Sequence, residues 1–222
     1  NGPHGPVTGA IIAEELHMDG SYENKTFAPG YGEFSSGGAG NLEALALAVP
    51  TDALAEPIPI ELETLLNGAL DIFNSAEAED WNAATATLET MTVAWNTYQA
   101  NAKVPELLAA QMNQALAALA GNALVPAVTA QNPTGARKAA LDVAQTSLDL
   151  EMQYRPLTEI NLARFDLWVL QLLADVPSNE PSLIMGDVTV LEWMWDRVSH
   201  TVDASAAEQI MAHLENLRSA AD

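Results

Sequence analysis

Residues 81–98, WNAATATLETMTVAWNTY, decide the fold class of this chain. Within them, apolar side chains follow one another at alternating steps of three and four residues: Trp81, Ala84, Leu88, Met91, Trp95 and Tyr98. This spacing places all of them on one stripe of an α-helix, and such a stripe has to be buried. We therefore expect Trp95, in the middle of the stripe, to lie in a hydrophobic core.

Further apolar stripes follow after Pro59, and they predict helices near residues 62–72, 108–119, 134–154, 162–176 and 184–202. Pro156 is expected to break or kink the helix before it, because proline removes a backbone donor and clashes with the preceding turn. Short connections between long amphipathic helices imply antiparallel neighbours. The chain is thus predicted to be all-α, with an antiparallel bundle of about six or seven helices at residues 60–222.

Some details of this bundle can be tested individually. The helix at 162–176 is expected to bury the stripe of Leu162, Phe165, Val169, Leu172 and Val176. Ser205 and Glu208 have the spacing of a capping box, which would open a short last helix. Trp193 lies beside the stripe of its helix, and burial is the preferred prediction for it, with an exposed anchor for a partner as the alternative.

Residues 1–59 form a different segment, an irregular N-terminal arm rich in glycine and proline. No helical period runs through it, although residues 15–19 alternate polar and apolar as a half-buried strand does. The arm also carries many large apolar residues, including Ile11, Ile12 and Phe27. We therefore expect it to be ordered by packing on the bundle or on a neighbouring molecule.

Composition limits the function further. The formal net charge is −22, from 30 acidic and 8 basic residues. Such a field repels phosphate backbones and anionic lipid, so nucleic-acid and membrane-surface binding are disfavoured, whereas cations and basic proteins are favoured partners. The alternative is that the acids only keep an alanine-rich surface soluble. The longest alanine- and leucine-rich stretch, near residues 115–130, is too interrupted to predict a transmembrane segment.

Catalytic motifs are absent from the sequence. There is no cysteine, which excludes disulfides, thiolate metal sites and cysteine nucleophiles. There is no Gly-x-Ser-x-Gly elbow, no phosphate-binding loop and no His-Glu-x-x-His pair. The expectation is a protein that is not an enzyme.

Two weaker groups of ligand-type residues remain. If residues 15–19 are extended, Glu15, His17 and Asp19 share one face, and His4 could complete a site for a divalent metal ion. Without thiolates, such a site suits zinc, copper(II) or manganese. The alternative is a solvated polar strand face.

Two other glutamates, Glu14 and Glu23, are substitute ligands if the segment curls. The second group is Glu192, Asp196 and His200, spaced by four residues on a helix. It lies off the apolar stripe, so a solvent-exposed face is the preferred interpretation.

Two stretches, NSAEAEDWNAATATLETMTVAW and ARKAALDVAQTSLDLEMQYRPLTEINLARFDLW, resemble all-helical extracytoplasmic lipoproteins of bacteria, families that are mostly uncharacterised. The resemblance covers residues 60–202 and implies a location outside the cytoplasm. The lipobox cysteine of such proteins is absent from this sequence, which begins at Asn1, so a lipid anchor would lie upstream.

These observations favour a non-enzymatic extracytoplasmic binding or scaffold protein of the bacterial cell envelope, with a protein or cation as its partner. The alternative is a divalent metal-handling protein whose N-terminal arm supplies the ligands.

Overall fold

The computed structural model describes residues 8–28, 32–37, 44–45, 57–102, 104–123 and 132–221. The chain divides into two compact units. One comprises Asn1–Pro57 with Met152–Leu157, and the other comprises Ile58–Glu151 with Thr158–Asp222.

The first unit contains a small sheet where the sequence predicted an irregular arm. Its strands are β1 (Ile11–Leu16), β2 (Tyr22–Ala28), β3 (Gly32–Gly37) and β4 (Ala44–Leu45). They are antiparallel and lie in the order β1-β2-β3-β4, with an irregularity in register between Thr26 and Phe27. Glycine and proline lie between these strands in the sequence, where they are typical of turns. An irregular segment was therefore predicted where turns connect short strands.

The second unit is all-α, as predicted. Its helices are α1 (Ile60–Glu77), α2 (Trp81–Asn101), α3 (Glu106–Ala123), α4 (Pro133–Glu151), α5 (Leu157–Asp175), α6 (Pro181–Val198) and α7 (Ala204–Ala221), with short 3-10 turns η2 (Val176–Ser178) and η3 (Ser199–Thr201). Asp80 caps α2 by accepting a hydrogen bond of 3.0 Å from the backbone N–H of Ala83. The break predicted at Pro156 is confirmed, because α4 ends before it and α5 begins after it.

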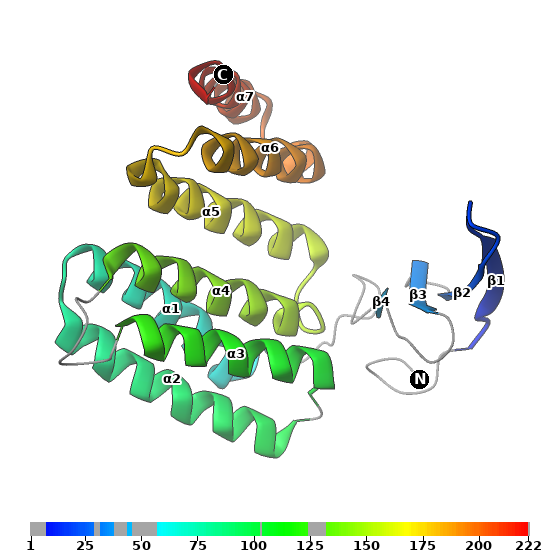
Figure 1. Cartoon of the computed structure of the whole chain (residues 1–222), viewed down its shortest axis with the longest axis horizontal. Coiled ribbons are helices and arrows are strands. Elements are labelled where there is room, and N and C mark those ends of the chain that lie inside the picture. Colours follow the sequence, from blue (N-terminus) through cyan, green and yellow to red (C-terminus); the bar gives the residue numbers. More distant parts are fainter. Residues whose placement is uncertain are drawn as a thin grey trace. The chain divides into compact units, whose positions relative to one another are not determined.

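The first four helices form one tightly packed group. The stripe of α2 is buried as predicted except at Trp81, which is half-buried, and Trp95 is only 2% exposed. Helix α4 packs against both α1 and α3, and its buried positions are mainly alanine, serine and other small residues. Figure 1 shows α4 among these helices. Small residues let neighbouring helices approach α4 from two sides, which explains why so many of its residues are buried.

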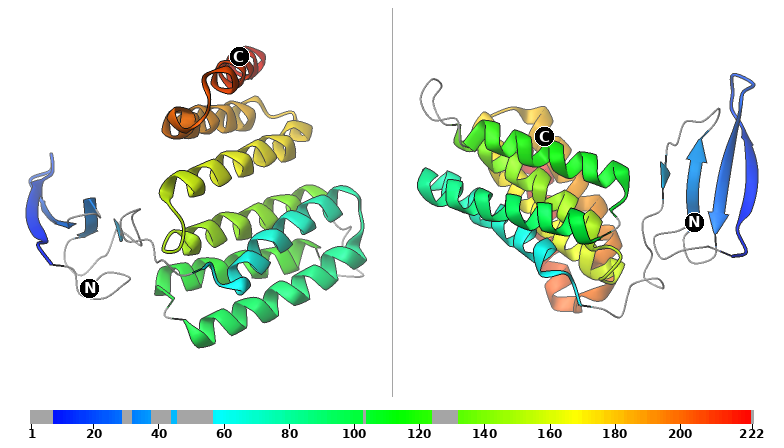
Figure 2. Two further views of the ribbon diagram at one scale, coloured as in Figure 1. Left: turned by 180° about the vertical axis from the view of Figure 1, so that it is seen from behind. Right: turned by 90° about the horizontal axis from the view of Figure 1, so that it is seen from below.

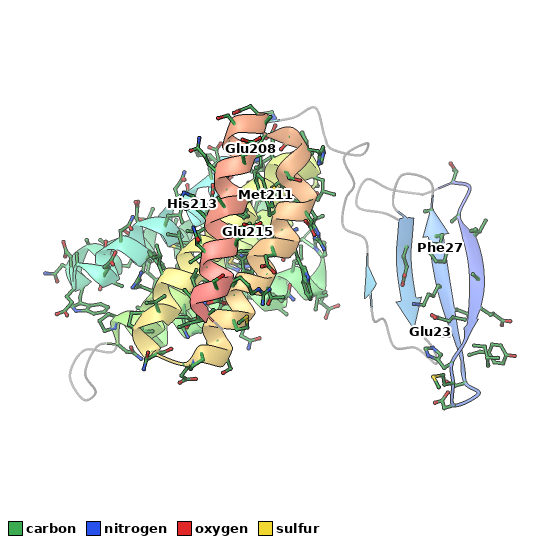
Figure 3. The ribbon with its side chains drawn as sticks, turned by 90° about the horizontal axis from the view of Figure 1, so that it is seen from above. Glu23, Phe27, Glu208, Met211, His213 and Glu215 are labelled. Carbon is green, nitrogen blue, oxygen red and sulfur yellow. The ribbon has the colours of Figure 1, made fainter. Side chains whose placement is uncertain are left out.

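The last three helices continue as layers beyond α4 (Figures 1 and 2). Their shared core is Leu172 of α5, Val188, Leu191, Trp195 and Val198 of α6, and Leu214 of α7. The stripe predicted for α6 is therefore confirmed. Helix α7 packs on α6 and buries Leu214 alone among its residues. Met211 and His213 of α7, labelled in Figure 3, are exposed.

The predicted stripe of α5 was wrong at several positions. Leu162 and Val169 are each 37% exposed and Val176 is 51% exposed, whereas Ile160 and Leu167 are buried. The reason is that α5 lies between two layers: Leu167 faces a pocket that α1 and α4 also line, while Leu172 belongs to the core with α6 and α7. A helix buried on two sides has no single stripe.

Two further details differ from the prediction. Trp193 is 63% exposed, so its burial was wrongly predicted. Helix α7 is capped by Asp203 instead of a Ser205–Glu208 box. The carboxylate of Asp203 accepts bonds of 3.0 Å from the backbone N–H groups of Ser205 and Ala206. Asp203 precedes Ser205 by two residues and supplies the side-chain oxygen acceptor that an N-cap needs, so α7 starts before Ser205.

Candidate metal centre

The candidate site lies at the end of the β1–β2 hairpin. The two strands pair Glu15 with Glu23 and Leu16 with Tyr22. The connecting turn is closed by two backbone bonds of 2.9 Å, from His17 to the carbonyl of Ser21 and from Gly20 to the carbonyl of His17. Gly20 has φ of +85°, a conformation that glycine adopts without strain. The turn therefore fixes a register in which two glutamates lie directly opposite each other.

Three ligand-type side chains meet there. Glu15, His17 and Glu23 each offer one ligand atom, and all these atoms lie within 4.8 Å of one another. The Nε2 atom of His17 is 3.4 Å from Oε2 of Glu23. Glu23, labelled on β2 in Figure 3, is buried, while the other two side chains are exposed. Its Oε1 atom has no hydrogen-bond partner, so one buried carboxylate oxygen is available to a ligand.

A lysine ammonium offsets part of the negative charge of this acidic group. The Nζ atom of Lys25 lies 2.9 Å from Glu15, 3.8 Å from Glu23 and 3.7 Å from Glu33. Its hydrogen bond lowers the pKa of Glu15, and the same bond raises the pKa of Lys25. Two carboxylates placed opposite each other repel, so the hairpin requires a positive charge at this point.

The structure brings together only part of the predicted ligand set. Glu15 and His17 lie in the cluster, and Glu23, which the sequence offered as a substitute, is the third member. Asp19 lies in the turn, where its carboxylate accepts bonds of 2.7 Å from the hydroxyl and 2.9 Å from the backbone N–H of Ser21. These bonds lower the pKa of Asp19. The strand ends before Asp19, so its side chain does not share the expected face; His4 lies outside the described residues.

The second predicted set is not assembled. Glu192 forms an ion pair with Arg218 of α7, through a bond of 3.0 Å from Nε to Oε1 and a second contact at Oε2. That bond lowers the pKa of Glu192. Asp196 and His200 are exposed. In the described part of the chain, the hairpin cluster is the one group of three or more such residues with metal-ligand spacing.

A buried polar cluster inside the bundle was not predicted from the sequence. Asp175, at the end of α5, is 2% exposed, and Asp187 of α6 is 6% exposed. Lys138 of α4 forms an ion pair with Asp175, and Gln171 donates a hydrogen bond to it. Burial and the nearby Asp175 carboxylate raise the pKa of Asp187 to about 6. The sequence did contain a signal for this cluster: Asp187 lies four residues before Leu191, so the spacing places it on the apolar side of α6.

Asp175 behaves in the opposite way. Burial raises its pKa, but the bonds from Lys138 and Gln171 outweigh that effect, so the pKa of Asp175 is lowered overall. The two carboxyl groups therefore divide one negative charge: Asp175 is ionised beside Lys138, and Asp187 holds a proton more readily. Lys138 balances one of the two carboxylates, and the Oδ2 atom of Asp187 has no hydrogen-bond partner. Above about pH 6 the cluster therefore carries a second negative charge that no cation in it balances.

Comparisons with known proteins give no family assignment. No protein-family model matches the chain, and neither a curated protein nor a solved structure matches it. Among the described helices, none has the length and apolar composition needed to cross a membrane.

Proposed function

We propose that this protein is a non-enzymatic binding protein and that its N-terminal hairpin takes up a divalent metal ion. The observation that supports the proposal is the grouping of Glu15, His17 and Glu23, with their ligand atoms within 4.8 Å of one another. Two carboxylates and an imidazole are a typical set of protein ligands for a divalent ion.

The charge of the hairpin explains why a cation would bind. Glu23 is buried, and its Oε1 atom has no partner. The opposing Glu15 is stabilised by Lys25, which acts as an internal cation. A divalent ion between the two glutamates would replace the ammonium, satisfy the free oxygen and neutralise more charge. Metal binding is therefore a competition with Lys25.

The ligand types limit the metal. Imidazole and carboxylate suit zinc, copper(II) and manganese, and the chain has no cysteine that would favour copper(I). Three ligands also leave positions for water or for a group supplied by a partner. Such an open site fits a protein that carries or presents a metal ion.

Calorimetric titration of the full chain with zinc, manganese and copper(II) tests the proposal. Glu23→Gln and His17→Ala should weaken binding, because each removes a ligand atom. Lys25→Met should strengthen it, because the competing ammonium is lost. Glu14→Gln is the matched control, since Glu14 pairs with Asn24 and therefore lies on the other face of the strand.

Two results would contradict a built site. One is the same loss of affinity in Glu14→Gln as in Glu23→Gln, which would indicate general attraction to an acidic surface. The other is weaker binding in Lys25→Met, which would mean that the lysine organises the acids instead of competing for them.

We also propose where in the cell this protein acts. We place the protein outside the cytoplasm, in the bacterial cell envelope, as a binding or scaffold protein. What supports this is the resemblance of residues 60–202 to extracytoplasmic lipoproteins. Fractionation of the producing cells, with a cytoplasmic marker as control, tests it.

A further inference from the structure

A pocket of about 380 Å³ opens between α1, α4 and α5. Leu66 and Leu70 of α1, Leu148 of α4 and Leu167 of α5 form its apolar walls. Ala163, one of the smaller lining residues, leaves space on the α5 side that a larger side chain would fill. The volume lies in the range of small-molecule sites, which commonly form between the helices of bundles.

One lining residue is charged. Asp166 of α5 borders the pocket and is also accessible to solvent, and no basic residue is among the side chains that line it in the described structure. Burial raises the pKa of Asp166, and no nearby positive charge lowers it. An apolar cavity with one uncompensated carboxylate is complementary to a molecule with an apolar body and one positive charge.

From this geometry we propose that the pocket binds a small amphiphilic cation, an alkylammonium compound, with its apolar body against Leu66, Leu148 and Leu167 and its charge beside Asp166. The apolar part gains free energy by leaving water, at about 25 cal/mol per Å² of buried surface. The carboxylate selects the positive head group. The strongly negative charge of the whole chain, −22, adds to the attraction and disfavours anionic amphiphiles.

This site is separate from the hairpin and does not depend on metal binding. The ligand of this pocket is an organic molecule and not a bare metal ion, because most of the residues that line the pocket have apolar side chains. The two sites can therefore fail or succeed independently in experiments on the same protein.

Calorimetric titration of the full chain with three probes of equal chain length tests the inference: octyltrimethylammonium, octanol and octanoate. High salt reduces the contribution of the general surface charge. We expect the ammonium probe to bind most tightly and octanoate most weakly. Asp166→Asn should weaken binding of the ammonium probe about tenfold and leave octanol unchanged. The affinity for the ammonium should also fall as the pH is lowered through the pKa of Asp166, since only the ionised carboxylate attracts it.

Asp142→Asn is the matched control. Burial raises the pKa of Asp142 in the same direction, but that residue lines a different, more polar depression with Gln145 and Asp149. Equal losses in the Asp166 and Asp142 variants would overturn the proposal, because they would show attraction to the surface as a whole.

Filling the pocket gives a second, charge-independent test. Ala163→Phe should abolish binding of both octyltrimethylammonium and octanol, because the added ring occupies the cavity. If that variant does not fold, Val169→Phe serves instead, since Val169 lines the pocket and is 37% exposed. Unchanged binding of both probes in a folded, filled variant would place their site elsewhere and refute the assignment.

Discussion

Trp95 of α2 donates its indole N–H to the side-chain oxygen of Asn113 of α3 over 2.7 Å. The tryptophan is 2% exposed and its ring stacks on that of Tyr98, with centroids 6.1 Å apart. A buried indole needs such an acceptor, because its N–H would otherwise lose a bond to water. The bond therefore connects the best-predicted stripe of the sequence to a neighbouring helix.

Replacing Trp95 by alanine should lower the free energy of unfolding by about 3 to 5 kcal/mol, through lost burial and the cavity left behind. Asn113→Ala should lower it by about 1 to 3 kcal/mol, because the buried N–H loses its acceptor. Denaturant unfolding measures both. Trp193→Ala is the control: this residue is 63% exposed, so a change within about 0.5 kcal/mol is expected. A large loss in the control would mean that Trp193 is buried in solution.

Gly68 sets how closely α1 and α2 approach. A Cβ atom added there would lie 2.6 Å from Cγ and 2.8 Å from Sδ of Met91, which is itself fully buried. Gly68→Ala should therefore lower stability by about 1 to 2 kcal/mol, because the strain of overpacking exceeds the gain in helix propensity.

The matched substitution is Gly186→Ala on α6, where an added Cβ meets nothing within 4 Å. It should raise stability by about 0.5 to 1 kcal/mol, the usual benefit of alanine over glycine inside a helix. Thermal and denaturant unfolding of the two variants give the comparison. Equal stabilisation by both would show that Met91 moves aside without loss.

Asp187 should make the stability of the bundle depend on pH. Its pKa is raised from 3.8 to about 6, so its contribution to stability is fully present below pH 3.8 and is lost as the pH rises through about 6. Asp187→Asn keeps a donor toward Asp175 at every pH. This variant should raise the free energy of unfolding at neutral pH by about 1 to 3 kcal/mol and flatten its pH dependence between about 4 and 6.

Asp175→Asn should have the opposite effect. The pKa of Asp175 is lowered overall, so its contribution is present above the ordinary aspartate value and is lost as the pH falls. Removing the charge leaves Lys138 without the anion that it contacts in the bundle, and stability at neutral pH should decrease. Denaturant unfolding across pH tests both variants, and a shift of the same sign in the two would show that the carboxyl groups do not divide one charge.

Much of the helical fold was predictable from the sequence because local patterns determine it. Helices α1, α2, α3, α4 and α6 form where apolar stripes predicted them, since each helix presents a main apolar side to its neighbours. Helix α5 was mispredicted at Val169 because it lies between two layers. The spacing of apolar residues along one helix does not show how many other helices pack against it. Trp193 illustrates the same limit. The hydrophobicity of a side chain makes its burial more frequent on average, but it does not show whether a particular residue faces the core.

The metal candidate was predictable in part for a related reason. An alternating strand correctly groups Glu15 with His17, because that relation is local. Glu23 joins them through the register of the hairpin, and the register depends on where the turn falls. The turn occupies Met18 to Gly20, so Asp19 serves the backbone of Ser21 instead of sharing the face with His17. Likewise, Lys138, Asp175 and Asp187 come together only through the packing of three helices.

The start of α7 distinguishes two caps that the sequence offers. The carboxylate of Asp203 accepts from two backbone N–H groups, while Ser205 lies inside the helix. Asp203→Ala should lower stability by about 0.5 to 2 kcal/mol, the usual effect of losing an N-cap. Ser205→Ala should have little effect, because alanine is a good helix former and no capping bond is lost.

Since Leu214 is the one buried residue of α7, weakening the cap should make this helix unfold before the others. Hydrogen exchange of its backbone would detect that local unfolding. Greater damage from Ser205→Ala than from Asp203→Ala would instead establish the capping box that the sequence suggested.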